Sequence, residues 1–149
     1  MGLKGKLLGQ IEISIHGDLF HEILAARPHH LPSMTSVVLA VDGQWGTQGC
    51  TTTFKYTQGG KTEIGESFMD TIDDEKKTVK YRVVKGDILK SFKSFIITCE
   101  VETNGDGNSV TWTVVYEKLK EEIPEPLAFM EYLFTLTKES VEHLAKLNP

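Results

Sequence analysis

Apolar and polar residues alternate along the first fifteen residues of the chain. Leu3, Leu7, Ile11, Ile13 and Ile15 occupy odd positions, whereas Lys, Gln, Glu and Ser fill most of the even positions between them. Successive side chains of a β-strand point to opposite faces, so this period of two indicates a strand with one buried face. We therefore expect a half-buried strand as the first element.

The next segment changes from a period of two to helical spacing. After Gly17 the run DLFHEILAA is typical of a short helix, which Pro28 would close. A second short helical turn is expected in the run PHHLPSM, which contains two prolines. Two short helices thus follow the first strand.

Six strand-like runs fill the middle of the chain between Ser36 and Lys120. They are separated by turn signals rich in Gly, Asp and Asn, such as DGQWGTQG, TQGG and NGDG. The runs are SVVLAV, CTTTFKY, TEIGESFMDTI, KTVKYRVV, SFKSFIITCEV and SVTWTVVYEKL. Consecutive strands joined by short turns predict an antiparallel sheet.

The last apolar pattern, from Glu125 to Leu147, has helical spacing. Pro124 and Pro126 lie at its start, where a missing N–H costs little. It is the longest predicted helix, and only this helix could cover the concave face of a curled sheet of seven strands. We predict one α+β domain over residues 1–149, with the sheet curved around this helix.

Alternation within the strands assigns one face of the sheet to the interior. That face carries Phe54, Tyr56, Val79, Tyr81, Val83, Phe95, Ile97, Cys99, Trp112, Val114 and Tyr116. Three of these are tyrosines, and because a buried phenol needs a partner, a cavity with polar groups is favoured over a solid core. The run TEIGESFMDTI is ambiguous, because Ile64, Phe68, Met69 and Ile72 do not select one face.

Composition and charge exclude several classes of partner. The chain has 16 Lys and Arg against 21 Asp and Glu, a net charge of -5, and the basic residues form no stripe that would bind nucleic acid. No apolar run approaches the roughly 18 residues of a membrane span, and no signal segment is evident, so we expect a cytoplasmic protein. In that compartment Cys50 and Cys99 are expected to stay reduced.

The glycine-rich segment DGQWGTQGCTTTFKYTQGGKT raises the question of a phosphate site. Its final Gly-Lys-Thr resembles the tail of a phosphate-binding loop, but Lys55 stands where that motif requires its first glycine. The spacing of Gly43, Gly46 and Gly49 also differs from the dinucleotide fingerprint, and no helical pattern follows. We therefore expect no nucleotide cofactor.

Four histidines, His16, His21, His29 and His30, lie close together in sequence near the predicted short helices. No Cys or carboxylate completes a recognisable metal-ligand spacing, and adjacent side chains point in different directions. Hydrogen-bonded or solvated histidines are therefore expected, with no metal and no other cofactor.

Three collinear segments, GQWGTQG, VKGDILKSFKSF and NSVTWTVVYEKLKEEIPEP, resemble plant major latex proteins over essentially the whole chain. These proteins are a branch of the birch pollen allergen and pathogenesis-related class-ten superfamily. The resemblance implies the START-like helix-grip fold, a seven-stranded antiparallel sheet around a long carboxy-terminal helix, enclosing a large apolar cavity. It also implies that the three glycines adopt positive φ angles in a tight connection. For Trp45 in this connection, we favour packing against the sheet over a contact with a membrane or a partner.

The resemblance leaves two function classes open. The first is a defence-related carrier or sensor of small sterol-like, phenolic, terpenoid or fatty molecules. The second is a cofactor-free cyclase or isomerase that moves a proton on a reactive terpenoid or alkaloid intermediate. We favour the first, because no catalytic triad can be placed and the lysine of some catalytic relatives has no secure counterpart. Ribonuclease activity is disfavoured by the net negative charge of the chain.

The expected oligomeric state is a monomer or a weak dimer.

The predicted ligand site combines inward residues of the sheet with residues of two helices. Its members are Ile23, Phe54, Tyr56, Tyr81, Phe95, Ile97, Trp112, Val114, Tyr116, Phe129, Tyr132, Leu133 and Leu136. In an enzyme, Tyr81, Tyr116 or His21 would be the candidates to transfer the proton. The choice of face depends on strand parity, which a single β-bulge would invert.

Overall fold

The structure is a computed structural model that describes residues 3–104 and 107–147. Its strands are β1 (Lys4–Ile13), β2 (Val38–Gly43), β3 (Thr51–Gln58), β4 (Lys61–Asp73), β5 (Thr78–Gly86), β6 (Phe92–Asn104) and β7 (Gly107–Lys118). Its helices are α1 (Gly17–Ala26), α2 (Leu31–Met34) and α3 (Leu127–Leu147), with 3-10 turns η1 (Pro28–His30) and η2 (Asp87–Lys90). Part of the predicted NGDG turn lies outside the described residues.

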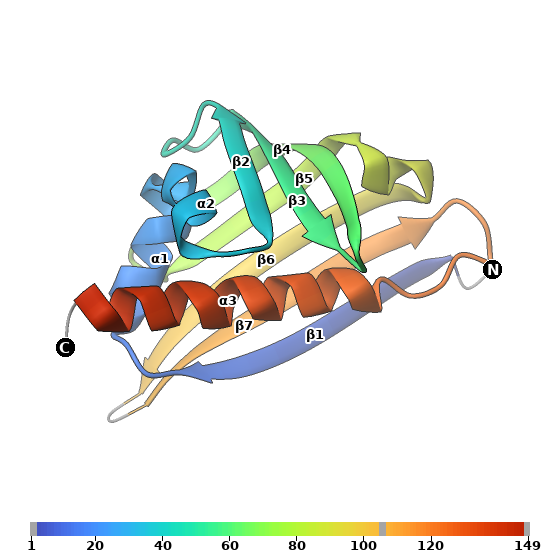
Figure 1. Ribbon diagram of the computed structural model, residues 1–149. Helices are drawn as coiled ribbons and strands as arrows, with labels where there is room; N and C mark the ends of the chain where they lie inside the picture. Colours follow the sequence, from blue (N-terminus) through green and yellow to red (C-terminus); the bar gives the residue numbers. More distant parts are fainter. Residues whose placement is uncertain (1–2, 105–106, 148–149) are drawn as a thin grey trace.

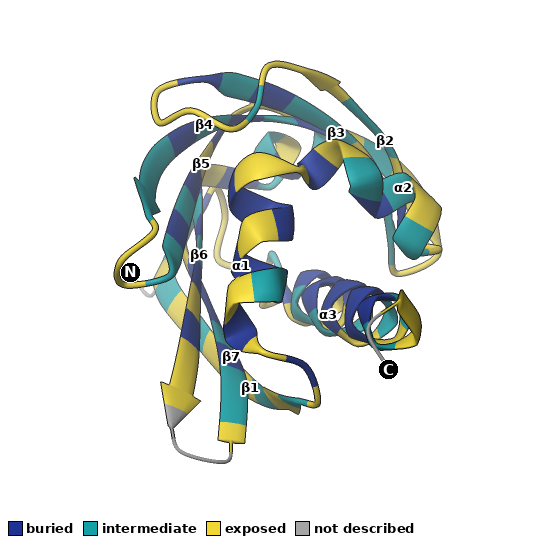
Figure 2. Ribbon diagram, turned by 90° about the vertical axis from the view of Figure 1, so that its left-hand side faces the viewer, coloured by how far each residue is buried: buried dark blue, intermediate teal, exposed yellow. Residues whose placement is uncertain are grey.

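The seven strands form one antiparallel sheet in the order β1-β7-β6-β5-β4-β3-β2. The first and last strands pair with each other, from Lys4 opposite Glu117 to Ile13 opposite Asn108. In Figure 1, α3 runs across the concave face of the sheet, and α1 and α2 lie near one end of it. Figure 2, which looks along α3, shows the sheet curving around this helix. The predicted fold class is therefore confirmed.

Strand parity correctly assigned the inner face of β3, β5, β6 and β7. All the side chains predicted to face inward are buried, apart from Phe54, which is half-buried. On the opposite face of the same strands, Val84 and Val115 are exposed. The alternation of polar and apolar residues thus describes the pleat of these strands directly.

The ambiguous run in β4 has a structural explanation. Gly65, Ser67 and Met69 are buried at alternate positions. A register shift against β5 then occurs between Met69 and Thr71, and Ile72 beyond it packs against the core. A β-bulge inverts parity in this way, so no single alternation could fit the whole strand.

The glycine-rich connection between β2 and β3 has the predicted backbone conformation. The φ angles of Gly43, Gly46 and Gly49 are 89°, 85° and 92°, values that favour glycine. The expected packing of Trp45 on the sheet is wrong, because its ring stacks on His29 of η1, with ring centroids 4.5 Å apart. The indole therefore holds the loop against the helical turns.

The Gly-Lys-Thr sequence belongs to a β-hairpin. Gly59 and Gly60 form the turn between β3 and β4 with φ angles of 55° and 77°, and Gln58 pairs with Lys61 across it. Two consecutive positive φ angles are typical of the tight turns that join twisted strands. The lysine and threonine continue into β4, so no helix begins at this turn.

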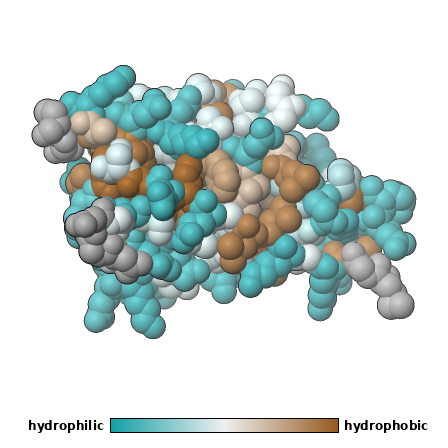
Figure 3. All heavy atoms as spheres, turned by 90° about the horizontal axis from the view of Figure 1, so that it is seen from below, coloured by the Kyte–Doolittle hydropathy of each residue, from teal (hydrophilic) through white to brown (hydrophobic). Residues whose placement is uncertain are grey.

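Helix α3 packs against β1 along one side of the molecule. A side chain at Gly9 would collide with the ring of Phe134, so the glycine permits close packing of strand and helix. Leu7, Ile11 and Met130 are partly buried against the core. Figure 3, seen from below, shows apolar side chains partly exposed between polar ones on the side where β1 and α3 lie. Among the described residues, no helix is long and apolar enough to cross a bilayer.

The two cysteines are buried free thiols. Cys50 directly precedes β3, and Cys99 lies in β6. Burial raises the pKa of the Cys99 thiol well above its ordinary value, which favours the unreactive protonated form.

Candidate functional site

An apolar cavity of about 60 Å³ lies between the concave face of the sheet and the helices. Its wall consists of Leu24, Leu31, Phe54, Tyr56, Gly65, Ser67, Tyr81, Val83, Ile97, Trp112, Phe129, Tyr132, Leu133 and Leu136. None of these side chains is a lysine, arginine, histidine or carboxylate. Phe54 is the half-buried member of the wall, which places it toward the surface. The cavity therefore suits an uncharged, mostly apolar occupant.

The structure brings nine of the predicted site residues together in this wall. They are Phe54, Tyr56, Tyr81, Ile97, Trp112, Phe129, Tyr132, Leu133 and Leu136. Four other predicted residues are buried but lie outside the wall: Ile23, Phe95, Val114 and Tyr116. Their side chains contribute to the core and not to the cavity surface.

Sequence reasoning missed five residues of the wall. Gly65 and Ser67 were missed because the β4 pattern is irregular, and Leu24 and Leu31 because only Ile23 was chosen from the short helices. Val83 was assigned to the inner face but not to the site. A rule that kept every inward residue of β4 and β5 would have found three of the five.

The cavity is smaller than the large cavity that the family resemblance implies. Aromatic side chains of α3 and β3 fill much of the interior, with ring centroids 4.9 Å apart for Tyr56 and Tyr132 and 5.9 Å for Tyr56 and Phe129. The remaining volume is about that of two water molecules in the liquid. A ligand with several rings would therefore require some of these side chains to move.

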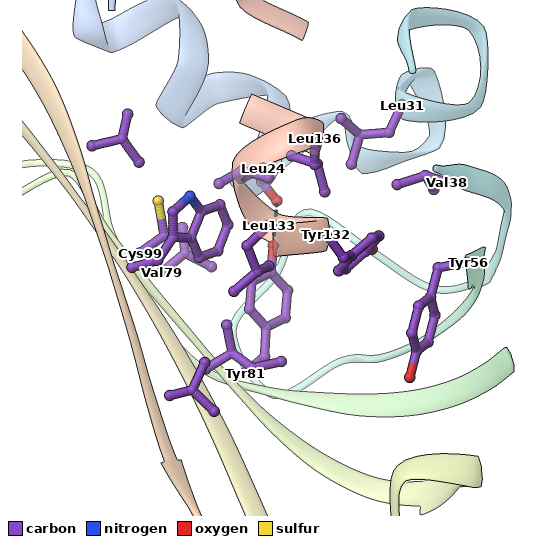
Figure 4. Close-up of a cluster of buried hydrophobic side chains, with 14 of the residues drawn as sticks. Leu24, Leu31, Val38, Tyr56, Val79, Tyr81, Cys99, Tyr132, Leu133 and Leu136 are labelled. Carbon is purple, nitrogen blue, oxygen red and sulfur yellow. Dashed lines mark hydrogen bonds between the residues drawn. The ribbon is translucent and has the colours of Figure 1, made fainter. Parts of the chain in front are cut away.

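Several polar atoms in the wall are already occupied by hydrogen bonds. The Tyr81 hydroxyl donates to the Leu24 carbonyl at 3.3 Å, as Figure 4 shows. The Tyr56 hydroxyl donates to Glu63 Oε1 at 3.2 Å, and Trp112 Nε1 donates to a threonine of α3 at 2.8 Å. These three groups are largely satisfied without a ligand.

The buried phenols of the wall stay protonated at neutral pH. Burial raises the pKa of Tyr81, Tyr56 and Tyr132 above the ordinary value for tyrosine. The Glu63 carboxylate raises the pKa of Tyr56 further. These hydroxyls can donate a hydrogen bond, but a raised pKa makes them weak proton donors, and in the neutral form they are poor bases.

The catalytic candidate His21 lies away from the cavity wall. It is buried on α1, and its Nε2 lies 2.9 Å from Oδ1 of the exposed Asp74 in the turn between β4 and β5. Lys77 of the same turn pairs with Asp18 at the start of α1, at 3.2 Å. These two contacts join α1 to the turn between β4 and β5.

The catalytic candidate Tyr116 also lies away from the cavity. Its hydroxyl donates to Glu125, just before α3, and the same carboxylate accepts a hydrogen bond from Lys118 Nζ at 2.6 Å. The Lys118 side chain is 8% exposed and that of Glu125 is 48% exposed, so a carboxylate at the surface compensates the charge of the buried lysine. We call Tyr116, Lys118 and Glu125 the helix anchor, because they join β7 to the start of α3.

The histidines near the short helices have separate partners. The His16 side chain accepts a hydrogen bond from the Asp18 N–H and caps α1, whereas His29 stacks on Trp45 and contacts His30. Within the described part of the chain, no three His, Cys, Asp or Glu residues are arranged to hold a metal ion.

The amino-acid sequence is similar to those of known plant proteins over nearly its whole length. The chain matches the family model for the pathogenesis-related protein Bet v 1 family over residues 2–147. It is 34% identical to MLP-like protein 31 of Arabidopsis thaliana over 148 residues, covering 95% of this chain and 86% of that protein. Two further relatives are longer, and the chain spans only 44% and 45% of their lengths.

Solved structures show the same similarity in three dimensions. The crystal structure of major latex-like protein 151 from Panax ginseng has a TM-score of 0.92 and 35% sequence identity, covering 95% of this chain and 98% of that one. Norcoclaurine synthase from Thalictrum flavum, in complex with dopamine and hydroxybenzaldehyde, has a TM-score of 0.81, covering 98% of this chain and 89% of the synthase. Its sequence identity is 16%, so this second similarity concerns the fold alone.

Proposed function

Because this chain belongs to the pathogenesis-related protein Bet v 1 family, we propose that it is a carrier or sensor of small hydrophobic molecules. The observation that supports this most is the cavity between the sheet and α3, whose wall contains no charged side chain. Sterol-like, phenolic, terpenoid and fatty molecules are the expected ligands. A role in plant defence rests on the family resemblance only.

The small size of the cavity affects how a ligand would enter. Phe54 is half-buried and touches Tyr81 edge to face, with ring centroids 6.0 Å apart. Rotation of such a ring costs little packing because one side already faces solvent. Binding would therefore begin with movement of Phe54, followed by adjustment of the buried rings.

A cavity-filling substitution tests the proposal. A Cβ at Gly65 would make ordinary contacts, the nearest with Tyr56 Cε1 at 3.6 Å, so Gly65→Val places new methyl groups in the cavity without backbone strain. Fluorescence titration with the neutral probe N-phenyl-1-naphthylamine should show strong binding to the wild type. The variant should bind about tenfold more weakly or worse, a loss of ~1.4 kcal/mol or more.

Glu66→Val is the matched control, because it adds the same side chain at the next residue of β4, which is not part of the cavity wall. It should bind the probe like the wild type. The proposal fails if the folded wild type does not bind the probe, or if the two valine variants lose the same affinity. Native mass spectrometry of protein purified from its source tissue would then identify a retained ligand directly.

A cofactor-free cyclase or isomerase is the second candidate function, favoured by the Tyr81 phenol in the cavity wall. In a carrier, Tyr81→Phe should leave ligand affinity nearly unchanged, because the Tyr81 hydroxyl already donates to the Leu24 carbonyl. In an enzyme that uses this phenol as its acid, the same change should reduce the rate by about 100-fold or more, with affinity nearly intact. Product formation from reactive terpenoid or alkaloid intermediates, compared with the spontaneous background, separates the two. Wild-type rates equal to background would exclude catalysis for the substrates tried.

A further inference from the structure

Two hydroxyl groups in the cavity wall have no hydrogen-bond partner among the described residues. They belong to Ser67 of β4 and Tyr132 of α3, which are only 6% and 7% exposed. An unpaired hydroxyl in an apolar wall can hydrogen-bond to a water molecule or to a ligand. Their lack of partners contrasts with Tyr56, Tyr81 and Trp112, whose polar atoms are already bonded.

Both free hydroxyls keep some accessible surface. Among the described residues, no side-chain nitrogen or oxygen is both sealed from a water-sized probe and unbonded. The oxygens of Ser67 and Tyr132 must therefore keep some accessible surface, and both residues belong to the cavity wall. In Figure 4 the Tyr132 ring lies between α3 and Tyr56. The cavity thus has two polar contact points, one from the sheet and one from α3.

The charge of the wall limits what can bind to these points. Among the described residues, no lysine, arginine or histidine lines the cavity, so a carboxylate would lose its hydration without gaining a counter-charge. No carboxylate is among the described lining residues either, so an ammonium group would also lose its hydration without gaining a counter-charge. A serine and a tyrosine hydroxyl can each donate or accept a hydrogen bond, which suits a neutral oxygen of either kind.

We propose that the ligand is an uncharged, mostly apolar molecule with a hydroxyl or carbonyl oxygen, which hydrogen-bonds to Ser67 Oγ and the Tyr132 hydroxyl. This inference rests on the proposed function, because it names the ligand class for the same cavity. It narrows that class by excluding fatty-acid anions and protonated amines. Ser67 and Tyr132 are the residues that determine this specificity.

Three naphthalene probes of similar size test the inference by calorimetric titration at neutral pH. They are 2-naphthol, 2-methylnaphthalene and 2-naphthoate, which carry a neutral hydroxyl, a methyl group and a carboxylate. The alcohol should bind about 2- to 12-fold more tightly than the hydrocarbon for each hydrogen bond that it forms. The carboxylate should bind more weakly than the hydrocarbon.

Substitutions that remove the two hydroxyls should abolish the preference for the alcohol. In the double variant with Ser67→Ala and Tyr132→Phe, naphthol and methylnaphthalene should bind with equal affinity. The affinity for methylnaphthalene should match the wild type, which also shows that the cavity is folded. Ser94→Ala, an exposed position of β6, should leave all three affinities unchanged.

The possible failures are distinguishable. Equal wild-type affinity for naphthol and methylnaphthalene, or naphthoate binding as tight as naphthol, would overturn the inference and leave the carrier function intact. A naphthol preference that survives in the double variant would also overturn it. Absence of binding by all three probes would count against the carrier function, and the inference would fall with it.

Discussion

At the scale of single residues, a short chain of hydrogen bonds crosses the apolar interior. Trp112 is almost fully buried, and its Nε1 donates to Thr137 Oγ1 at 2.8 Å. The threonine hydroxyl in turn donates to the Leu133 carbonyl of α3, also at 2.8 Å. Every polar atom of the indole and the threonine side chain is therefore satisfied, and the sheet is joined to the helix through them.

Replacing Thr137 with valine keeps the shape of the side chain but removes the acceptor. The Trp112 N–H would then be buried without a partner, which should lower the free energy of unfolding by about 1 to 3 kcal/mol. Urea denaturation, monitored by tryptophan fluorescence and by circular dichroism, measures this change.

Thr113→Val is the matched control, because Thr113 is also buried but its hydroxyl makes no hydrogen bond with the described residues. It should change stability by no more than about 0.5 kcal/mol. If the two valine variants lose the same stability, the hydrogen bond from Trp112 is not the cause.

The sequence predicted the burial of single residues better than their polar contacts. Parity placed Trp112 and Tyr81 inside correctly, since it depends only on the pleat of the strand. The partners, Thr137 and the Leu24 carbonyl, lie on other elements and are set by how the helices are rotated against the sheet. No local pattern carries that information, and for the same reason His21 and Tyr116 were expected near the cavity but lie outside its wall.

At the scale of elements, the helix anchor fixes where α3 begins. The nearly buried Lys118 and the Tyr116 hydroxyl share the Glu125 carboxylate, two residues before the first residue of α3. A carboxylate at this end also interacts favourably with the positive end of the helix dipole. The anchor therefore holds the first turn of α3 on the last strand.

Removal of the carboxylate charge should weaken the anchor. Glu125→Gln leaves the Lys118 ammonium buried without a counter-charge, and we expect a loss of roughly 1.5 to 3 kcal/mol in unfolding free energy. Amide hydrogen exchange in the first turn of α3 should become faster. Adding Lys118→Met removes the buried charge and should restore part of the stability. A double variant that is less stable than Glu125→Gln alone would contradict this account of the anchor.

Elements were predicted well where one pattern runs through them and poorly where it is interrupted. The strands β3, β5, β6 and β7 followed from uninterrupted alternation, whereas the bulge in β4 divided its apolar residues between two faces. Gly65 and Ser67 were lost from the predicted site for this reason. The contact of Trp45 with His29 was missed because it joins two loops that have no periodic pattern.

At the scale of the whole molecule, the cavity couples ligand binding to global stability. Both the sheet and α3 line it, so unfolding of either one destroys the site. A ligand present at 100 times its dissociation constant should add about 2.7 kcal/mol to the free energy of unfolding. Thermal unfolding can be monitored by the circular dichroism of the helix and by tryptophan fluorescence. The midpoint temperature should rise equally in both signals, in proportion to the logarithm of ligand concentration.

The variant Gly65→Val should fold, but the same ligand concentration should raise its midpoint temperature of unfolding much less than that of the wild type. A ligand that stabilises both proteins equally would have to bind elsewhere. A shift in only one of the two signals would show that the sheet and α3 do not unfold as one unit.

The arrangement of the molecule was predictable in outline, but the size of its cavity was not. Counting seven strands and one long helix was sufficient for the topology, because few arrangements can cover such a sheet. The volume depends on how the rings of Tyr56, Phe129 and Tyr132 pack in the interior. Such packing reflects side-chain rotamers and small shifts of α3, which composition does not reveal.

The pairing of β1 with β7 has a consequence for synthesis on the ribosome. Lys4 lies opposite Glu117, so the strand made first must wait for a partner made more than a hundred residues later. Closing so long a loop is slow, and contacts of high sequence separation form late in folding. During translation the apolar side of β1 stays uncovered, and both edges of that strand can pair with another chain. The nascent protein should therefore depend most on chaperones just before its last strand emerges.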